Sequence, residues 1–361
     1  MNKAYKFRIY PNNEQKILLA KTFGCVRFVY NKMLAEKQAF YEETGKPLRI
    51  TPAKYKPEYE WLREVDSLAL ANAQIHLEAA YKNFFRDKNV GYPKFKSKRC
   101  GYDSYTTNLV NGNIVLEAGR LKLPKAGEVK IKQHRMIPAG YRLKSVTVSK
   151  APSGRYYAAI LYEYEEDITP VCPVNVVGLD FSMKELYISS DGECANYPRF
   201  YRQSQEKLAR GQRKLSRRAK GGRNREKQRL KVAKLHEHTA NQRKDFLHKQ
   251  SRQIANAYDA VCIEDLNMRG MSQALNFGKS VSDNGWGMFS GFMEYKLKEQ
   301  GKQLVKTDKW SPSSKTRSGC GAVKDEMPLS ERVFRCDCGF ICDRDINAAI
   351  NIRNEGMRLL V

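Results

Sequence analysis

Three carboxylates in the second half of the chain stand at the ends of hydrophobic segments, where they could hold metal ions. Asp180 and Glu264 each close a short apolar run, and Asp345 opens a helix-like stretch that continues to Leu360. A carboxylate at the end of a buried strand is costly unless it is paired or binds a cation. In a strongly basic chain, three such acids indicate Mg²⁺ (or Mn²⁺) ions beside a phosphodiester, the arrangement of a two-metal nuclease site.

Each acid also has an ordinary structural interpretation when it is considered alone. Asp180 could be a turn residue, Glu264 could pair with an arginine, and Asp345 could stabilise the positive end of a helix dipole. Their joint placement, with Asp265 and Asp343 close by in the sequence, favours the metal-dependent interpretation.

The segments that follow the boundary-like stretch 166–170 predict a mixed α/β sheet, because strand-like runs alternate with helical ones. In the last helix, Ile346, Ala349 and Ile350 form the expected buried stripe. The predicted strands are 174–180, 185–190, 260–264 and 303–307, and the predicted helices are a basic region ending near 257, 288–300 and 346–360.

The first half predicts a small β-barrel with helices inserted after its first strand. A strand over 4–9 precedes a helix that begins after Asn12, where Gln15 completes a capping box, and ends before Gly45. A helix over 67–85 has its apolar face at Leu68, Leu70, Ala71, Ile75, Leu77 and Ala80. Short strands are predicted over 113–117, 120–123 and 128–132, and a hairpin over 143–149 and 155–165.

The composition indicates a polyanionic partner. Lys and Arg total 65 against 39 Asp and Glu in 361 residues, a net charge of +26, which favours nucleic acid. An anionic membrane is a weaker alternative, because the basic stretches lack an amphipathic face and no run of about 18 apolar residues predicts a span. The start of the chain contains no secretory signal, so we expect a cytoplasmic, nucleoid-associated bacterial or archaeal protein.

The most basic stretch, 207–234, carries thirteen Lys or Arg and one acid, Glu226. Like charges one helical turn apart destabilise a helix, and contact with a phosphate backbone would relieve the repulsion. A helix that is merely solvated is the alternative. The candidate phosphate contacts are Arg210, Arg213, Lys214, Arg217, Arg218, Arg225 and Arg229. His236 and His238, two residues apart in the basic helical region, do not share a helix face and are expected at the surface.

A second candidate nucleic-acid contact is the stretch 92–99, in which aromatic and basic residues alternate. Aromatic rings stack on unpaired bases while lysine and arginine contact phosphates. The candidate contacts are Lys94, Phe95, Lys96, Lys98 and Arg99. A lysine-protected edge strand is the alternative interpretation.

Nine cysteines, an odd number, indicate a reducing compartment. Four of them near the C-terminus could bind zinc: Cys320, Cys336, Cys338 and Cys342. A zinc ribbon requires two knuckles, each with two residues between its cysteines. Here the first knuckle offers one thiol, and the second has one residue between its cysteines instead of two. Zinc binding and a hairpin without metal therefore both remain open.

Motifs along nearly the whole chain resemble the TnpB (OrfB-type) family, which bacterial insertion sequences that move as single-stranded DNA encode. The matching motifs are at 5–11, 92–98, 178–180, 263–268, 313–316 and 343–349. The last three are the most specific, and their order and spacing would be hard to obtain by chance.

The resemblance implies an RNA-guided DNA endonuclease related to type V CRISPR effectors. It implies a wedge β-barrel (1–10 and 88–168) with an inserted helical recognition lobe (11–87). An RNase-H-like RuvC nuclease domain (172–361) follows, with a zinc-ribbon-like insertion (311–343). Matched motif by motif, Asp180, Glu264 and Asp345 take the catalytic, magnesium-binding positions. Arg317 stands where the family usually has the first ribbon cysteine, which leaves the zinc occupancy open.

The partners that the resemblance implies are a structured guide RNA from the transposon end and double-stranded DNA with a short flanking motif. Base pairing would then select the target sequence. Two other functions remain alternatives: a nuclease-inactive RNA-guided DNA-binding repressor and a DNA-binding regulator without a guide. The first would lack one of the three acids, and all three are present.

Overall fold

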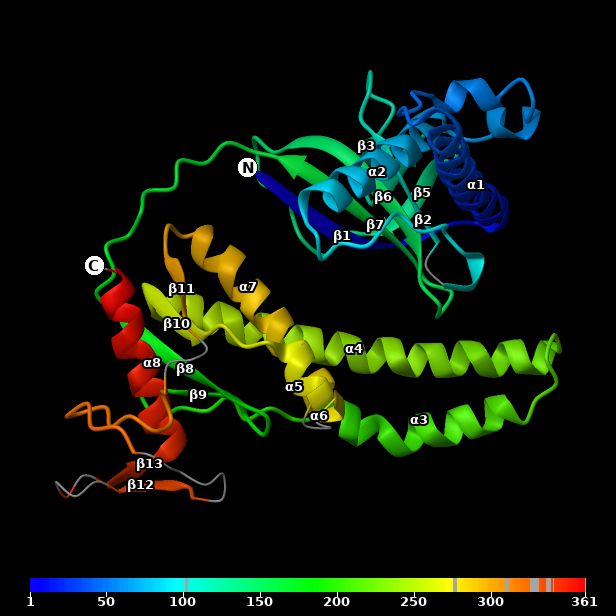
Figure 1. Cartoon of the computed structure of the whole chain (residues 1–361). Helices are drawn as coiled ribbons and strands as arrows, with labels where there is room; N and C mark the ends of the chain where they lie inside the picture. Colours follow the sequence, from blue (N-terminus) through cyan, green and yellow to red (C-terminus); the bar gives the residue numbers. More distant parts are fainter. Residues whose placement is uncertain are drawn as a thin grey trace. The chain divides into compact units, whose positions relative to one another are not determined.

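The computed structural model describes residues 1–100, 103–274, 278–308, 312–324, 331–335, 339 and 341–360. The chain divides into two compact units, Met1–Glu166 and Asp167–Val361, and each has its own sheet and hydrophobic core (Figure 1). Within the described ranges, no helix combines the length and the hydrophobicity that crossing a bilayer requires.

The first unit is built on a curled antiparallel sheet with the strand order β2-β6-β7-β1-β5-β4-β3. Its strands are β1 (Asn2–Tyr10), β2 (Asp103–Asn108), β3 (Val115–Glu117), β4 (Arg120–Leu123), β5 (Gly127–Lys132), β6 (Arg142–Lys150) and β7 (Tyr156–Glu163). Because β2 and β3 are the two edges of the described sheet, the barrel expected from the sequence is a half-barrel. The sequence does not predict β2, because this strand is polar and buries only Tyr105 and Thr107.

Two long helices pack on this sheet. Helix α1 (Asn13–Thr44) begins with the predicted capping box and ends at Gly45, which adopts the left-handed conformation, so both predictions are confirmed. Helix α2 (Ser67–Arg86) is also confirmed, but its predicted apolar face is partly wrong because Ile75 is 50% exposed. The helix instead turns Ala69, Leu70, Asn72, Ala73 and Leu77 inward. Short 3₁₀ turns occur at Pro52–Tyr55 (η1), Glu60–Arg63 (η2) and Lys98–Cys100 (η3).

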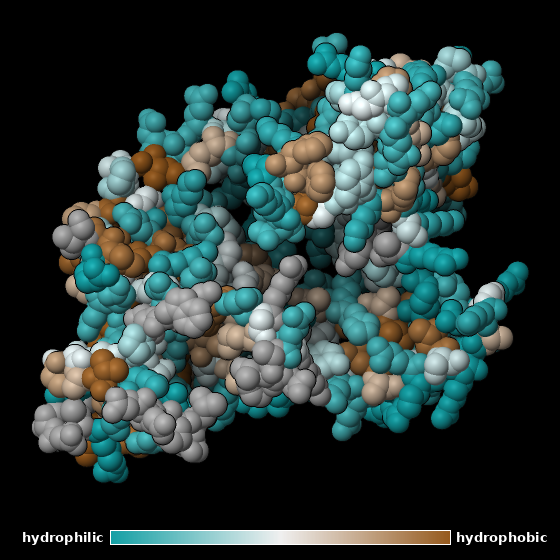
Figure 2. Space-filling model, viewed as in Figure 1, coloured by the Kyte–Doolittle hydropathy of each residue, from teal (hydrophilic) through white to brown (hydrophobic). Residues whose placement is uncertain are grey.

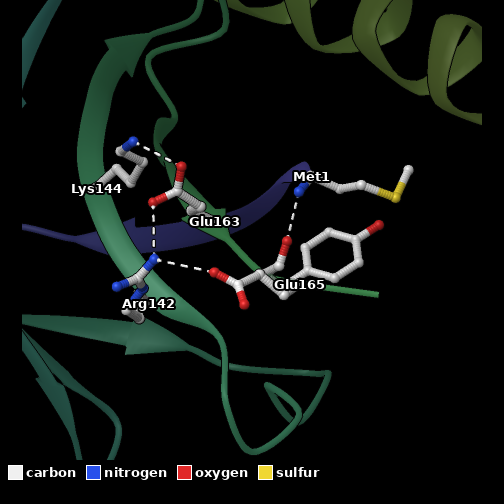
Figure 3. A network of polar contacts seen from close by, with 6 residues as sticks. Met1, Arg142, Lys144, Glu163 and Glu165 are labelled. Carbon is white, nitrogen blue, oxygen red and sulfur yellow. Dashed lines mark hydrogen bonds and ion pairs between the residues drawn. The ribbon is translucent and has the colours of Figure 1, made fainter. Parts of the chain in front are cut away.

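Polar contacts hold the start of β1 beside the end of β7 (Figure 3). The α-amino group of Met1 donates a hydrogen bond to the carbonyl oxygen of Tyr164. Arg142 and Lys144 of β6 both pair with Glu163, with N–O distances of 3.4 and 2.9 Å. Exposed ion pairs of this kind contribute at most about 1 kcal/mol. These ion pairs join β6 to β7, whereas the start of β1 is held to β7 by the Met1 hydrogen bond and by the ladder between the two strands.

The second unit has a four-stranded sheet with the order β11-β10-β8-β9, in which only β9 runs antiparallel. Val177, Leu179, Val261 and Ile263 pack against α4 and α7 in one hydrophobic core. Helix α8 lies on the opposite face, and this arrangement of helices on both faces is visible in Figure 1. The strands are β8 (Val176–Ser182), β9 (Leu186–Ser189), β10 (Ala260–Glu264) and β11 (Gln303–Thr307), with a separate hairpin of β12 (Val333–Arg335) and β13 (Ile341–Asp343). The helices are α3 (Phe200–Ser216), α4 (Arg223–Ala257), α5 (Met268–Ala274), α6 (Gly278–Asn284), α7 (Trp286–Lys298) and α8 (Arg344–Leu360).

Helix α8 contacts the sheet largely through small residues, and of the predicted stripe only Ala349 is fully buried. Ile346 and Ile350 are only half-buried, whereas the fully buried residues of the helix are Asn347, Ala348, Ala349, Ile352 and Gly356. The reason is a very close approach between helix and sheet. A Cβ atom on Gly178 would lie 2.6 Å from the backbone nitrogen of Arg353, and a Cβ on Gly356 would lie 2.6 Å from the Cβ of Cys262.

The basic region folds as a hairpin of two helices. Helices α3 and α4 pack against each other and are joined by the turn 217–222, where Gly221 has a φ of +84°. Leu208 and Val232 are buried between the helices, and a Cβ on Gly211 would approach Val232 to 3.1 Å. The far half of α4, with Leu247 and Ile254, belongs to the core of the sheet. One helix therefore extends from the core into the hairpin (Figure 1).

Candidate active site

The pairing of two central strands brings Asp180 and Glu264 side by side. Strands β8 and β10 are parallel neighbours whose register ends at Leu179 and Ile263, so the two acids follow at adjacent positions. Neighbouring strands lie about 4.8 Å apart, and side chains two residues apart share a face. Since Gly178 and Cys262 face α8, Asp180 and Glu264 face the same side.

Helix α8 carries the third acid, Asp345, in its first turn on this face of the sheet. Asp343, which precedes the helix, accepts hydrogen bonds from the backbone N–H groups of Asp345 and Ile346, at 2.9 and 3.2 Å. This is the geometry of a helix N-cap, which stabilises a helix by about 1 kcal/mol. Asp343 therefore has a structural role that is separate from the three acids. Asp265, the other acid close by in the sequence, is exposed.

The three carboxylates interact electrostatically. Burial raises the pKa of Asp180 well above its usual range, and repulsion from Glu264 and then from Asp345 raises it further. The Arg344 guanidinium opposes this shift only in part. Burial also raises the pKa of Glu264. The centre of the site thus concentrates negative charge beyond what nearby cationic side chains offset.

The donor set at this site is chemically suited to a hard divalent cation. Carboxylate oxygens are the ligands that Mg²⁺ and Mn²⁺ prefer, and a cation would offset the repulsion at Asp180. In the part of the chain that the structure describes, however, no group of three or more His, Cys, Asp or Glu side chains is spaced to hold one metal ion. The three acids therefore converge without forming a ready coordination shell, and their side chains would have to turn inward to share an ion.

Two residues outside the sheet contact these acids. The hydroxyl of Ser313 donates a hydrogen bond to Oε1 of Glu264, and it lowers the pKa that burial has raised. Nη1 of Arg332 lies 3.5 Å from Oδ2 of Asp345. The sequence reasoning did not identify either residue as part of the site, although Ser313 lies in one of the motifs that resemble the TnpB family.

Two asparagines of α8 bind the segment that carries Ser313. Nδ2 of Asn351 donates to the carbonyl oxygens of Ser313 and Thr316, at 2.7 and 2.5 Å. Nδ2 of Asn347 donates to the same carbonyl of Thr316 at 2.7 Å, and its Oδ1 accepts from the backbone N–H of Ser318 at 3.0 Å. The segment 313–318 is therefore fixed to the helix that begins with Asp345.

Most of the predicted phosphate contacts lie exposed on the α3–α4 hairpin. Five of them are exposed: Arg210, Arg213, Lys214, Arg217 and Arg218. Arg225 is half-buried, and Arg229 pairs with Glu226 at 2.6 Å, which offsets part of its charge. Hydrophilic side chains cover most of this hairpin in the view of Figure 2. His236 and His238 are exposed, so their prediction as surface residues is confirmed.

The stretch 92–99 has no regular structure as far as Ser97 and then enters the 3₁₀ turn η3, so the edge-strand alternative is wrong. Its backbone is held at Lys96, whose N–H and carbonyl both bond to the side chain of Asn31. The Lys96 ammonium lies 4.1 Å from the centre of the Tyr30 ring, and burial lowers its pKa. Phe95 is 55% exposed, and Lys94, Lys98 and Arg99 are also exposed.

Two of the four candidate zinc ligands, Cys336 and Cys338, lie outside the described residues. Cys320 is exposed and Cys342 is half-buried. Near Cys320, the backbone N–H of Arg317 donates to the carbonyl of Ala322 at 2.9 Å, so the chain forms a turn at the position of the first expected knuckle. The turn forms with Arg317 at the position where the resemblance to the TnpB family implies a cysteine.

Family profiles match most of the chain. The profile described as "Probable transposase" matches residues 159–275, and the one described as "Cas12f1-like, TNB domain" matches 286–352. A profile described as "Helix-turn-helix domain" matches residues 1–46, which here form β1 and one continuous helix, α1.

Curated relatives are similar over the full chain. A protein of Streptomyces pristinaespiralis named "Putative RNA-guided DNA endonuclease" is 37% identical, over 99% of this chain and 90% of the relative. The protein of Escherichia coli K12 named "Putative RNA-guided DNA endonuclease InsQ" is 31% identical, over 99% of this chain and 93% of the relative. Among solved structures, a Cas12f1–sgRNA–target DNA complex matches with a TM-score of 0.63 and 14% identity, over 98% of this chain and 99% of that one. The last likeness indicates a shared fold.

Proposed function

We propose that this chain, which belongs to the TnpB (OrfB-type) family, is a transposon-encoded RNA-guided DNA endonuclease. Relatives with that name support the activity, and the Cas12f-like fold supports the architecture. Within this proposal, 1–10 and 88–168 form the wedge domain and 11–87 the recognition lobe. The RuvC nuclease domain comprises 172–361, and its zinc-ribbon-like insertion comprises 311–343.

The observation that carries the nuclease assignment is the pair of acids at adjacent positions of parallel strands, Asp180 and Glu264. Two half-buried carboxylates that repel each other are unfavourable for stability, as the raised pKa of Asp180 indicates. A protein that only binds nucleic acid by its shape would gain nothing from the destabilisation that this repulsion causes. A cation between the acids and a phosphodiester would offset it.

In this proposal Asp180 and Glu264 hold divalent metal from the sheet, and Asp345 holds it from the first turn of α8. Bound Mg²⁺ or Mn²⁺ would activate water on one side of the scissile phosphate and stabilise the leaving oxygen on the other. The chain supplies these oxygen ligands from rigid elements, which hold them at fixed positions relative to the substrate. The Ser313 hydroxyl orients Glu264, and the Asp343 cap fixes the first turn that carries Asp345.

The α3–α4 hairpin supports a nucleic-acid partner of the same unit. Its exposed arginines and lysines, such as Arg213 and Lys214, present positive charge along a helix that extends beyond the core. Neutralising phosphates with these side chains would release counterions and make binding strongly salt-dependent. The exposed Phe95 beside Lys94 and Lys98 offers a stacking contact in the first unit.

The test begins with protein purified from its host, from which co-purifying RNA is sequenced and matched to the transposon end. The ribonucleoprotein should then cut guide-matched DNA in Mg²⁺ or Mn²⁺. Asp180→Ala and Glu264→Ala should abolish cutting while RNA binding is retained. Glu193→Ala, an exposed carboxylate beyond β9, is the matched control and should cut normally.

Each other outcome points to a different function. Equal cutting by wild type and by the Asp180 and Glu264 variants would refute their catalytic roles. Target binding without any cutting by the wild type would favour the guided repressor. Absence of a discrete RNA would favour a regulator without a guide.

A further inference from the structure

We infer that Ser313 is a positioning residue for Glu264, and that Asn347 and Asn351 of α8 hold it in place. This inference rests on the proposed nuclease function, because it assigns a role in orienting one of the proposed metal-binding acids. It gives the segment 313–318 a function, which is to hold Ser313 at Glu264.

The contact between Ser313 and Glu264 is specific and shielded. Ser313 is 7% exposed, and its hydroxyl donates to one oxygen of Glu264, Oε1. A carboxylate with one oxygen fixed in this way keeps its second oxygen available for an ion, and its side-chain torsions are restricted. Carboxylates that bind metals are commonly oriented by such hydrogen bonds, and loss of the partner typically costs about 10–100-fold in metal affinity or activity.

Ser313 cannot hold this position by itself, because it lies in a segment without regular structure. Asn351 binds the carbonyl oxygen of Ser313 directly, and it shares the carbonyl of Thr316 with Asn347. The two asparagines are four residues apart, so they project from the same face of α8. The segment is thereby anchored at its first, fourth and sixth residues by one turn of helix.

The chemistry of Asn347 explains why an amide is required there. It is completely buried, and it donates with Nδ2 to Thr316 while it accepts with Oδ1 from the N–H of Ser318. A carboxylate of the same shape could not donate, so the Thr316 carbonyl would keep the bond from Asn351 but lose the one from Asn347. The anchor thus depends on residue type and not only on residue size.

Helix α8 therefore organises two of the three acids. It carries Asp345 in its first turn, and the turn from Asn347 to Asn351 holds the segment whose serine orients Glu264. The close approach at Gly178 fixes this helix against the strand that ends in Asp180. Glu264 is coupled to α8 through Ser313, although it lies on a different element.

The experiment compares Ser313→Ala, Ser313→Thr and the control Ser314→Ala in the guide-loaded protein. Ser314 is the neighbouring hydroxyl, and it makes no side-chain hydrogen bond in the part of the chain that the structure describes. Ser313→Ala should raise the half-saturating Mg²⁺ concentration for cleavage about tenfold. RNA and target-DNA binding should not change. Ser313→Thr, which retains the hydroxyl, should recover most of the loss, and Ser314→Ala should behave as wild type.

A readout without cleavage uses Mg²⁺ alone as the probe. The increase in unfolding temperature with added Mg²⁺ should require about tenfold more metal in Ser313→Ala than in wild type. Unfolding in EDTA reports whether each variant is folded. If Ser313→Ala is folded and needs no more Mg²⁺ than wild type in both assays, the inference is overturned. A wild type that never cuts would instead count against the proposed function.

A double-mutant cycle tests the anchor. Asn351→Ala should shift the Mg²⁺ requirement in the same direction as Ser313→Ala, and the double variant should shift it little further, because both changes remove one interaction. If the two shifts in the logarithm of the Mg²⁺ requirement add fully, Asn351 acts independently of Ser313 and the anchoring role is refuted.

Discussion

The close contact between β8 and α8 predicts that Gly178→Ala will destabilise the second unit. A Cβ on Gly178 would lie 2.6 Å from the backbone nitrogen of Arg353 and closer still to the carbonyl oxygen of Ala349. Both neighbours are helix backbone, so no side-chain rotation can relieve the overlap. Since ordinary contacts begin at 3.4 Å, α8 must withdraw by at least about 0.8 Å.

The size of the effect follows from what α8 buries. Ala348, Ala349 and Ile352 are at most 1% exposed against the sheet. A gap of 0.5–1 Å already forfeits about a quarter to a half of each dispersion contact. Overpacking of this kind costs about 1–3 kcal/mol and occasionally more. For a unit of this size, about 3 kcal/mol lowers the unfolding temperature by roughly 6–12 °C.

The assay is thermal unfolding of purified protein, with DNA cleavage measured in parallel. Cleavage should fall as well, because the displaced helix carries Asp345. Gly291→Ala is the matched control, since Gly291 lies in helix α7, is exposed and has no atom within 4 Å of an added Cβ. It should be neutral or stabilise by about 0.5–1 kcal/mol. If Gly178→Ala unfolds at the wild-type temperature, the close approach does not limit the packing of α8.

Two further predictions concern charge. Because the pKa of Asp180 is raised in the folded chain, this carboxyl destabilises the fold at neutral pH, and the cost declines as the pH falls below the raised pKa and is gone below the ordinary pKa of an aspartate. In EDTA, Asp180→Asn should therefore unfold at a higher temperature than wild type at neutral pH, with a gap that closes in acid; a variant that is less stable at every pH would contradict this. For the hairpin, Arg213→Gln combined with Lys214→Gln should weaken RNA binding and reduce the slope of log K against log salt by about one per lost phosphate contact. An unchanged slope, measured by filter binding across a salt series, would remove these two residues from the interface.

The sequence predicted elements well where the signal is local. The capping box at Asn12 and the glycine stop at Gly45 defined α1, because caps depend on residues within one turn. Alternating hydrophobic residues defined most strands in the same way. The sequence pattern did not predict β2, because this strand is polar. It also misplaced part of the buried face of α2, because which side of a helix is buried depends on what packs against it.

For the candidate site, the sequence placed the acids at strand and helix ends but could not supply their distances. Asp180 and Glu264 are neighbours only because β8 pairs with β10 in one register, and a shift of one residue would turn Glu264 to the opposite face. Zinc binding by the C-terminal cysteines stays a prediction, since Cys336 and Cys338 lie outside the described residues.

The chain by itself determined residue type and local pattern: three acids that end apolar segments, a net charge of +26, and a basic helical stretch. Only the tertiary structure decided that Ser313 meets Glu264, that Asp343 caps a helix, and that two glycines let α8 approach the sheet. The physical reason is that propensity and periodicity act over a few residues. Contacts between residues far apart in sequence depend on register and close packing, which no single segment encodes.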